Sequence, residues 1–352
     1  MKPFSSVLKT ALRLLVFPLG LLLCQTLPAA VSFTVTPSAV SNTYTGNLTL
    51  QVAGLTNGET VVVQKFLDAN TNSTVDAADL LVQQFQLKDG QASLFGTVTN
   101  INVPGDTDST AGQITAQLIF QNGDFVQKIA GKYAFKLSSP SGNFAPLTNS
   151  FSVTDFPYLQ SITGSVVSSG TNVANASIIL FPPPRPGHGP GSPLGGTVAN
   201  DSGNYSIKVS PGVYTLLAFK SNYLANAATA PVVTVNSGAT VATNLVLANA
   251  TQNISGKIAD AATNSIGLPG LGLHGSASGL IAFGFSDTNG NFTLRVSPGQ
   301  WGLGTEGLAA HGYIGFDSDN FSVNTTTGSV SGVIVAYPKA TALFYGSVKD
   351  DQ

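Results

Sequence analysis

The fold is decided by Asp287-Thr-Asn-Gly-Asn-Phe-Thr-Leu-Arg-Val-Ser-Pro-Gly-Gln-Trp301 and by its counterpart Asp201-Ser-Gly-Asn-Tyr-Ser-Ile-Lys-Val-Ser-Pro-Gly-Val-Tyr214. Each stretch begins with a Gly-Asn-aromatic turn, continues as a short alternating segment, and ends with Ser-Pro-Gly and another aromatic residue. Glycine supplies the positive φ of a tight turn, and proline fixes φ at the entry to the next one. Asp201 and Asp287 fit the same scheme as turn formers. The two stretches therefore predict strand–turn–strand units that repeat along the chain.

A second motif recurs upstream of each stretch. Ser161-Ile-Thr-Gly-Ser-Val166 returns as Asn253-Ile-Ser-Gly-Lys-Ile258 and as Leu343-Phe-Tyr-Gly-Ser-Val348, so that Gly164, Gly256 and Gly346 lie about 90 residues apart, the length of a small domain. The third copy has two interpretations. It is either a terminal strand that completes the preceding repeat, or the start of a further repeat at 342–352. The second interpretation is favoured. Repeat arrays normally end in an atypical capping unit, whereas Leu343–Val348 looks like the start of an ordinary repeat.

These motifs resemble carboxypeptidase regulatory-like repeats. The resemblance covers about 160–340 and rests on Gly-x-Val/Ile in the first strand, Asp-x-x-Gly-x-Phe/Tyr in the middle, and Ser-Pro-Gly-x-Tyr/Trp near the end. It implies small transthyretin-like sandwiches, grouped with the starch-binding-like folds, that serve as accessory modules without catalytic residues. Two departures are a proline-rich insertion at Phe181–Pro193 and Leu268–Gly272 in place of the usual Pro-x-x-Gly-Val.

The first half of the chain also reads as strands. Alternating runs rich in Val, Thr, Ile and Phe occupy Val31–Val35, Asn47–Val52 and Gln113–Phe120, and no convincing 3.6-residue period follows residue 30. We therefore expect an all-β chain of tandem β-sandwich domains. An immunoglobulin-like sandwich is expected at 31–157, followed by two carboxypeptidase-regulatory-like repeats at 158–250 and 251–341.

The N-terminus has the pattern of a secretory signal over residues 1–30. Lys2, Lys9 and Arg13 precede the apolar run Leu14–Leu23, which is too short to span a bilayer of about 30 Å. Cys24 raises the alternative of a lipid anchor, but Leu23 stands where lipid-attachment signals place a small residue, so simple cleavage is favoured. We expect a secreted or cell-surface protein with no transmembrane span in the mature chain.

Composition narrows the range of functions. Of 352 residues 43% are hydrophobic, only 9% are charged, and the net charge is −2, so there is no basic surface for nucleic acid. With one cysteine and three histidines (His188, His274 and His311) at unrelated spacings, zinc fingers and most metalloenzyme sites are excluded, and each histidine is expected in a loop or on the surface. No Gly-x-Ser-x-Gly motif is present. We expect a protein that is not an enzyme.

One loop has the spacing of a calcium site. In Asp68-Ala-Asn-Thr-Asn-Ser-Thr-Val-Asp-Ala-Ala-Asp79, oxygen donors fall at positions 1, 3, 5, 9 and 12 of a 12-residue loop, and position 7 offers its carbonyl. The pattern resembles the calcium loops of dockerins and of surface adhesins. Ser73 replaces the usual glycine at position 6, where a left-handed conformation costs about 1–2 kcal/mol. The alternative is a polar hairpin loop between strands at 60–67 and 80–87. The resemblance implies a structural Ca²⁺ held by Asp68, Asn70, Asn72, the Thr74 carbonyl, Asp79 and, directly or through water, Asp76.

Other polar and aromatic residues have structural interpretations. The acidic turns at 105–112 and 317–320 lack a full ligand spacing. Trp301 and Tyr214 occupy equivalent places in the two repeats and are expected in the core. The function that fits best is adhesion or scaffolding at a cell surface, with an extracellular polysaccharide or a surface protein as partner. The alternative is a carbohydrate-binding accessory module of a larger secreted hydrolase, which predicts an exposed aromatic platform formed by Trp301, Tyr214 or Tyr313.

Overall fold

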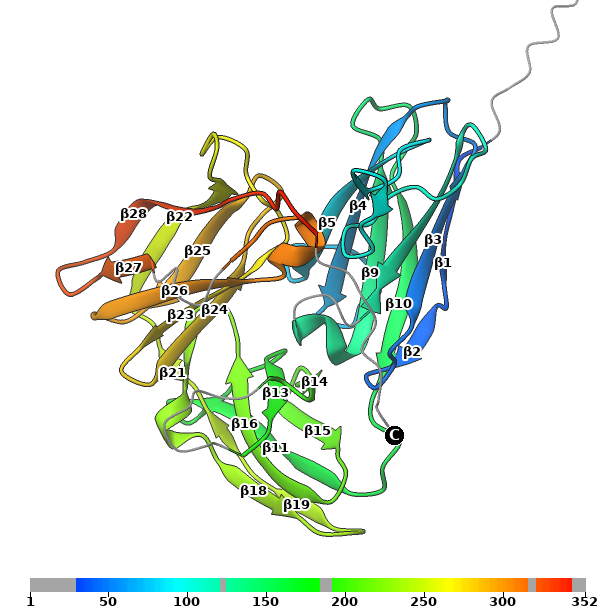
Figure 1. Ribbon diagram of the computed structural model, residues 1–352. Helices are drawn as coiled ribbons and strands as arrows, with labels where there is room; N and C mark the ends of the chain where they lie inside the picture. The colour runs from blue at the N-terminus through cyan, green and yellow to red at the C-terminus, as the bar shows by residue number, and fades with distance from the viewer. Residues whose placement is uncertain (1–29, 121–124, 184–191, 316–320, 344–352) are drawn as a thin grey trace, which may run out of the picture. The chain divides into compact units, whose positions relative to one another are not determined.

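The computed structural model describes residues 30–120, 125–183, 192–315 and 321–343. These residues form strands joined by turns, and the described helical segments are the short 3₁₀ turns η2 (Phe125–Lys128), η3 (Ala227–Thr229) and η4 (Leu308–His311). The prediction of an all-β chain built from tandem units is confirmed (Figure 1). Within the described residues no helix is long and apolar enough to cross a membrane. The predicted signal with Cys24, the third marker with Gly346, His188 and the acidic turn at 317–320 lie outside the described residues.

The first sandwich packs a three-stranded sheet against a larger one. Along β3 and β8 every second residue is buried, as expected for strands with one face on a core. The predicted hairpin at 60–87 is confirmed as the antiparallel pair β4–β5. The smaller sheet has the strand order β1 (Ser32–Thr36), β3 (Asn47–Ala53), β8 (Gln113–Ile119). The larger sheet has the order β5 (Leu80–Lys88), β4 (Thr60–Asp68), β9 (Ile129–Ser138), β10 (Leu147–Thr154), β2 (Ala39–Ser41). A separate hairpin is formed by β6 (Leu94–Phe95) and β7 (Val98–Thr99).

A lysine lies in the core of the first sandwich. Lys65, on β4, is 0% exposed. Its Nζ is 4.8 Å from the ring centre of Tyr133 and 5.3, 5.4 and 5.7 Å from those of Phe151, Phe120 and Phe135. Burial lowers the pKa of Lys65 to about 7, because the charged form loses its hydration. The surrounding rings favour the cation that remains.

The second sandwich places the marker strand β11 in the middle of a sheet. It pairs antiparallel with β15 and in parallel with β19 and β20. In the facing sheet, β14 also pairs in parallel with β9 of the first sandwich over two residue pairs. The strands are β11 (Ser161–Ser168), β12 (Thr171–Asn172), β15 (Asn204–Lys208), β19 (Thr240–Ala242) and β20 (Leu245–Val246), facing β18 (Val232–Val235), β16 (Gly212–Phe219), β13 (Ser177–Phe181) and β14 (Gly195–Val198).

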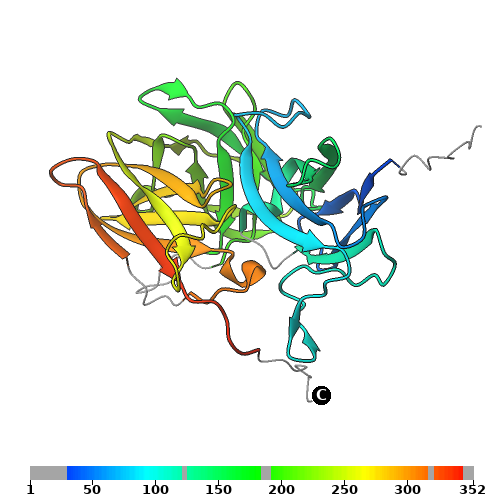
Figure 2. The ribbon, with the colours of Figure 1, turned by 90° about the horizontal axis from the view of Figure 1, so that it is seen from above.

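The third sandwich repeats this plan around β22, which pairs antiparallel with β25 and in parallel with β28. Its facing sheet includes β17 and β21, which the sequence analysis assigned to the preceding repeat; β17 covers an edge of β24 that would otherwise be unpaired. Figure 2 shows these yellow-to-red strands from above. They are β25 (Asn291–Val296), β22 (Gln252–Asp260) and β28 (Val330–Tyr337), facing β21 (Ala248–Asn249), β17 (Tyr223–Asn226), β24 (Leu280–Phe285), β23 (Gly272–Ala277), β26 (Gln300–Glu306) and β27 (Phe321–Asn324).

The structure explains the glycine of the recurring marker. A Cβ built on Gly164 would lie 1.7 Å from the carbonyl oxygen of Thr243, and one on Gly256 would lie 1.9 Å from that of Val333. Both carbonyls belong to the parallel neighbour of the marker strand. That neighbour is interrupted between β19 and β20 in one repeat, and its register shifts beside β22 in the other. The marker therefore requires glycine because an irregular neighbouring backbone occupies the space of a side chain.

The hairpin turn of each repeat is closed by a side-chain oxygen that accepts two backbone N–H groups. In the third sandwich Asp287 Oδ1 accepts the N–H groups of Asn289 and Asn291, both at 2.8 Å. In the second sandwich the same role belongs to Asn200, whose Oδ1 accepts from Ser202 at 3.0 Å and Asn204 at 2.9 Å. Asp201 lies in this turn, as predicted, but the acceptor is Asn200: the turn is one residue shorter after the aspartate, so the equivalent position is the preceding asparagine, which forms the same Asx turn.

The aromatic residues after Ser-Pro-Gly belong to the cores, as predicted. Trp301 is 0% exposed and Tyr214 6%. Trp301 Nε1 donates to the carbonyl of Ser297 at 2.9 Å, and Tyr214 Oη donates to that of Ser210 at 2.8 Å. Each repeat thus uses the serine carbonyl of its turn to satisfy the polar atom of a buried aromatic side chain. Neither ring is available as a platform for a sugar.

Candidate functional site

The 12-residue loop connects β4 to β5 at one end of the first sandwich. Ser73 has φ +65°, the left-handed conformation that position 6 of a calcium loop requires. Asp68, 2% exposed, is the last residue of β4, and its carboxylate accepts the N–H groups of Asn72 at 3.1 Å and Ser73 at 2.8 Å. The loop is therefore folded around the side chain of its first residue.

Hydrogen bonds among its own side chains close the rest of the loop. Asn72 Oδ1 accepts the N–H of Thr74 at 2.8 Å. Asn70 Nδ2 and Asn72 Nδ2 both donate to Asp76 Oδ2, at 3.1 and 2.6 Å. These bonds and one from the Ala78 N–H hold the pKa of Asp76 below its usual range, with the Ala78 bond the largest contribution. All six predicted ligand residues lie in this one loop, with the amide groups of the asparagines turned toward Asp76.

The two carboxylate oxygens of Asp79, at position 12, have different surroundings. Oδ2 accepts the Asp76 N–H at 3.0 Å, whereas Oδ1 is buried and makes no hydrogen bond of normal geometry within the described residues; the Ala69 N–H also acts on this carboxyl and lowers its pKa. Burial raises the pKa of Asp79, and the charges of Asp76 and Asp68 raise it further. The Lys132 ammonium donates to the Thr71 carbonyl at 3.3 Å rather than to a carboxylate. The loop thus concentrates negative charge, and no ion pair with a described residue offsets it.

Carboxylates alone do not make a metal centre here. Across the described ranges, no three His, Cys, Asp or Glu side chains are grouped so as to hold a metal ion. Three of the six predicted ligands are neutral: the amide oxygens of Asn70 and Asn72 and the main-chain carbonyl of Thr74. Hard cations such as Ca²⁺ accept such oxygens.

The acidic turn at 105–112 serves the fold, as predicted. Asp106 is 2% exposed, and its Oδ1 accepts the N–H groups of Asp108 and Thr115, both at 2.9 Å. Its Oδ2 accepts the Gly90 N–H at 2.8 Å. Asp89, which the sequence analysis did not single out, accepts from two further backbone N–H groups. These carboxylates pin a long loop to the sandwich.

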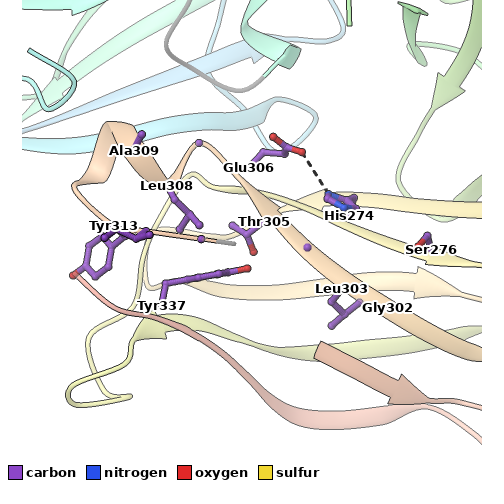
Figure 3. Close-up of a pocket in the computed structure, with 14 residues that line it drawn as sticks. His274, Ser276, Gly302, Leu303, Thr305, Glu306, Leu308, Ala309, Tyr313 and Tyr337 are labelled. Atoms are coloured by element: carbon purple, nitrogen blue, oxygen red, sulfur yellow. Dashed lines mark ion pairs between the residues drawn. The ribbon is translucent and has the colours of Figure 1, made fainter. Parts of the chain in front are cut away.

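A pocket of about 470 Å³ in the third sandwich was missed by the sequence analysis. His274 lies on β23, not in a loop, and its Nδ1 is 3.8 Å from Glu306 Oε1 on β26 (Figure 3). The two side chains are 40% and 44% exposed. Tyr313 also lines the pocket, and its hydroxyl donates to Asp260 at 2.8 Å. The third histidine, His311 in η4, is half-buried, and desolvation lowers its pKa to about 4.

Comparisons with known proteins find likenesses among solved structures. No protein family and no curated protein matches the chain. The Bacillus anthracis TIE protein is 12% identical with a TM-score of 0.23; the match covers 90% of this chain, which spans 59% of the length of that one. A streptococcal ancillary pilin is 15% identical with a TM-score of 0.23 and coverages of 81% and 93%. A shaft pilin SpaA from Lactobacillus rhamnosus GG is 12% identical with a TM-score of 0.22 and coverages of 52% and 98%. At these identities and TM-scores the likenesses assign the chain to no family.

Proposed function

We propose that this chain is a secreted or cell-surface, non-catalytic scaffolding or adhesion protein built from tandem β-sandwiches. The proposal rests on one observation: the residues that recur in the repeats have structural roles. Gly164 and Gly256 accommodate a neighbouring backbone, Asn200 and Asp287 close turns, and the aromatic residues after Ser-Pro-Gly fill cores. The repeated part of the sequence thus specifies architecture, which is the property that a spacer or display protein needs.

Surface labelling of the cells that make the protein tests this proposal. We expect an antibody against residues 31–343 to bind intact cells or to find the protein in the medium, with the purified chain beginning near residue 31, because residues 1–30 have the pattern of a cleaved signal. A variant lacking 1–30 should stay inside the cell. Full-length protein confined to the cytosol with its first 30 residues intact would contradict the proposal.

Within this function, the 68–79 loop is proposed to bind one structural Ca²⁺. Three features support the ion: the left-handed Ser73, the buried Asp79 Oδ1, and the raised pKa of Asp79. Because Asp68 and Asp76 raise that pKa by their charge, a divalent cation held by the loop's carboxylate, amide and carbonyl oxygens together would relieve their repulsion. Binding requires Asp76 to exchange its amide hydrogen bonds for the ion.

Calcium affinity measured on the loop variants tests the ligand set. Extracellular modules bind Ca²⁺ with Kd on the order of 10⁻⁴–10⁻³ M, and Ser73 places this loop toward the weak end. We expect Asp79→Asn to weaken the affinity about tenfold or more in calorimetric titrations of the whole chain, because it removes a charged ligand. Asp201→Asn, an exposed aspartate in the second sandwich, is the matched control and should leave Kd unchanged. Equal affinity for wild type and Asp79→Asn would show that any ion binds elsewhere.

A further inference from the structure

The pocket of the third sandwich lies on the outward side of two paired strands. In the register of β23 with β26, His274 stands opposite Gly304 and Ser276 stands opposite Gly302. Residues of β26 alternate between the core and this outer side: Trp301 and Leu303 are buried, and Gly302 and Gly304, which follow them, are not. Beside these strands the pocket is therefore floored by β26 backbone, with side chains from β23 and from the end of β26. Residues 307–309 and 313–315 and Tyr337 line the rest of it.

The two glycines shape the pocket in different ways. A Cβ on Gly302 would meet no atom within 4 Å, so that any side chain there would project into open space. A Cβ on Gly304 would lie 2.6 Å from the imidazole of His274. Gly304 thus lets the imidazole lie across β26 toward Glu306, as Figure 3 shows, and Gly302 keeps the space beside it empty.

The polar groups around this space suit a neutral ligand. Glu306 offers a carboxylate acceptor, His274 a ring nitrogen, and Ser276 an exposed hydroxyl. Among the described residues that line the pocket there is no lysine or arginine, so an anion would find no counter-charge there beside Glu306. One carboxylate and one imidazole are also too few to cage a metal ion.

We propose that this pocket binds a neutral saccharide unit. Adjacent sugar hydroxyls can donate to the Glu306 carboxylate and accept from His274. Ligand-binding pockets of about 300–1,000 Å³ typically orient a small ligand by a few polar contacts of this kind. Of the three aromatic residues predicted for a platform, Trp301 and Tyr214 lie in the cores, whereas Tyr313 lines this pocket. The site is independent of the calcium loop and of the scaffolding function.

Proton NMR of the whole chain tests the pocket through its own histidine. The chain has three histidines, and His274→Gln identifies the His274 ring resonance. The probes are glucose, galactose, N-acetylglucosamine, maltose and cellobiose, with glucuronate as the anionic comparison. We expect at least one neutral sugar to shift the His274 resonance with Kd on the order of millimolar, leaving the other two histidines unchanged, and glucuronate to bind at least tenfold more weakly.

A matched pair of variants locates the binding. Gly302→Phe places a ring in the pocket where the structure has room for it, and it should weaken the sugar affinity at least tenfold. Thr293→Phe adds the same bulk on an exposed position of β25 and should have no effect. Fluorescence of Trp301 confirms that both variants are folded. The proposal is overturned if no neutral sugar of the set shifts His274, if glucuronate binds as well, or if Gly302→Phe binds like wild type.

Discussion

Gly256→Ala is expected to unfold the third sandwich or to cost it about 4–5 kcal/mol or more. The new Cβ would lie 1.9 Å from the Val333 carbonyl oxygen and 2.7 Å from its carbon, and both belong to backbone that is paired with β22. Strand separation is the only relief, and it would break a central ladder of the sheet. Trp301 is buried in the same core and is the only tryptophan of the chain, so its fluorescence during denaturation reports this sandwich directly.

Gly302→Ala is the control, since it makes the same chemical change on a strand of the same sandwich. Its Cβ meets nothing within 4 Å, and we expect a change within about 0.5 kcal/mol. Gly164→Ala should repeat the large loss in the second sandwich, where the Cβ would lie 1.7 Å from the Thr243 oxygen. If Gly256→Ala and Gly302→Ala denature together, the marker glycine has no steric role.

Asp106→Ala is expected to destabilise the first sandwich by about 2–4 kcal/mol, because it removes a buried carboxylate that accepts three part-buried N–H groups. These donors belong to Gly90, Asp108 and Thr115. Asp106→Asn should recover only part of the loss, since its NH₂ group must face a donor on one side. Calorimetric unfolding in chelator measures the effect apart from any calcium.

Asp201→Ala supplies the comparison for Asp106→Ala. Its side chain is exposed, and the turn beside it is closed by Asn200 instead. We expect it to unfold like wild type. A loss below about 1 kcal/mol for Asp106→Ala would mean that water replaces the carboxylate and that the loop is not pinned by it.

Local patterns in the sequence predicted those parts of the fold that depend on neighbouring residues. Alternation gave the hairpin of β4 and β5 within one residue, and the loop spacing placed Ser73 where a left-handed residue is found. The same local logic placed Asp201 in its turn but did not identify the acceptor, because a one-residue difference in turn length moves that role to Asn200. Composition cannot distinguish an Asx turn closed by asparagine from one closed by aspartate.

The pocket could not have been predicted, because it depends on pairing between distant strands. His274 meets Glu306 only through the register of β23 with β26, which no sequence spacing encodes. The only sequence feature that pointed to the pocket was the pair of alternating glycines at 302 and 304. They indicate an open strand face only once it is known that the neighbouring Trp301 points into the core. The membership of β17 in the third sandwich is missed for the same reason.

Thermal unfolding of the whole chain in Ca²⁺ and in chelator tests the central claim, that the first sandwich holds a structural ion in the loop from Asp68 to Asp79. At free calcium about ten times Kd, binding adds about 1.4 kcal/mol, and the transition of a unit of this size should rise by roughly 3–7 °C. Asp68→Ala and Asp79→Ala should lose that shift, while the transition that Trp301 reports stays in place. Identical melting of the wild type in both solutions would show that the loop is a polar turn and nothing more.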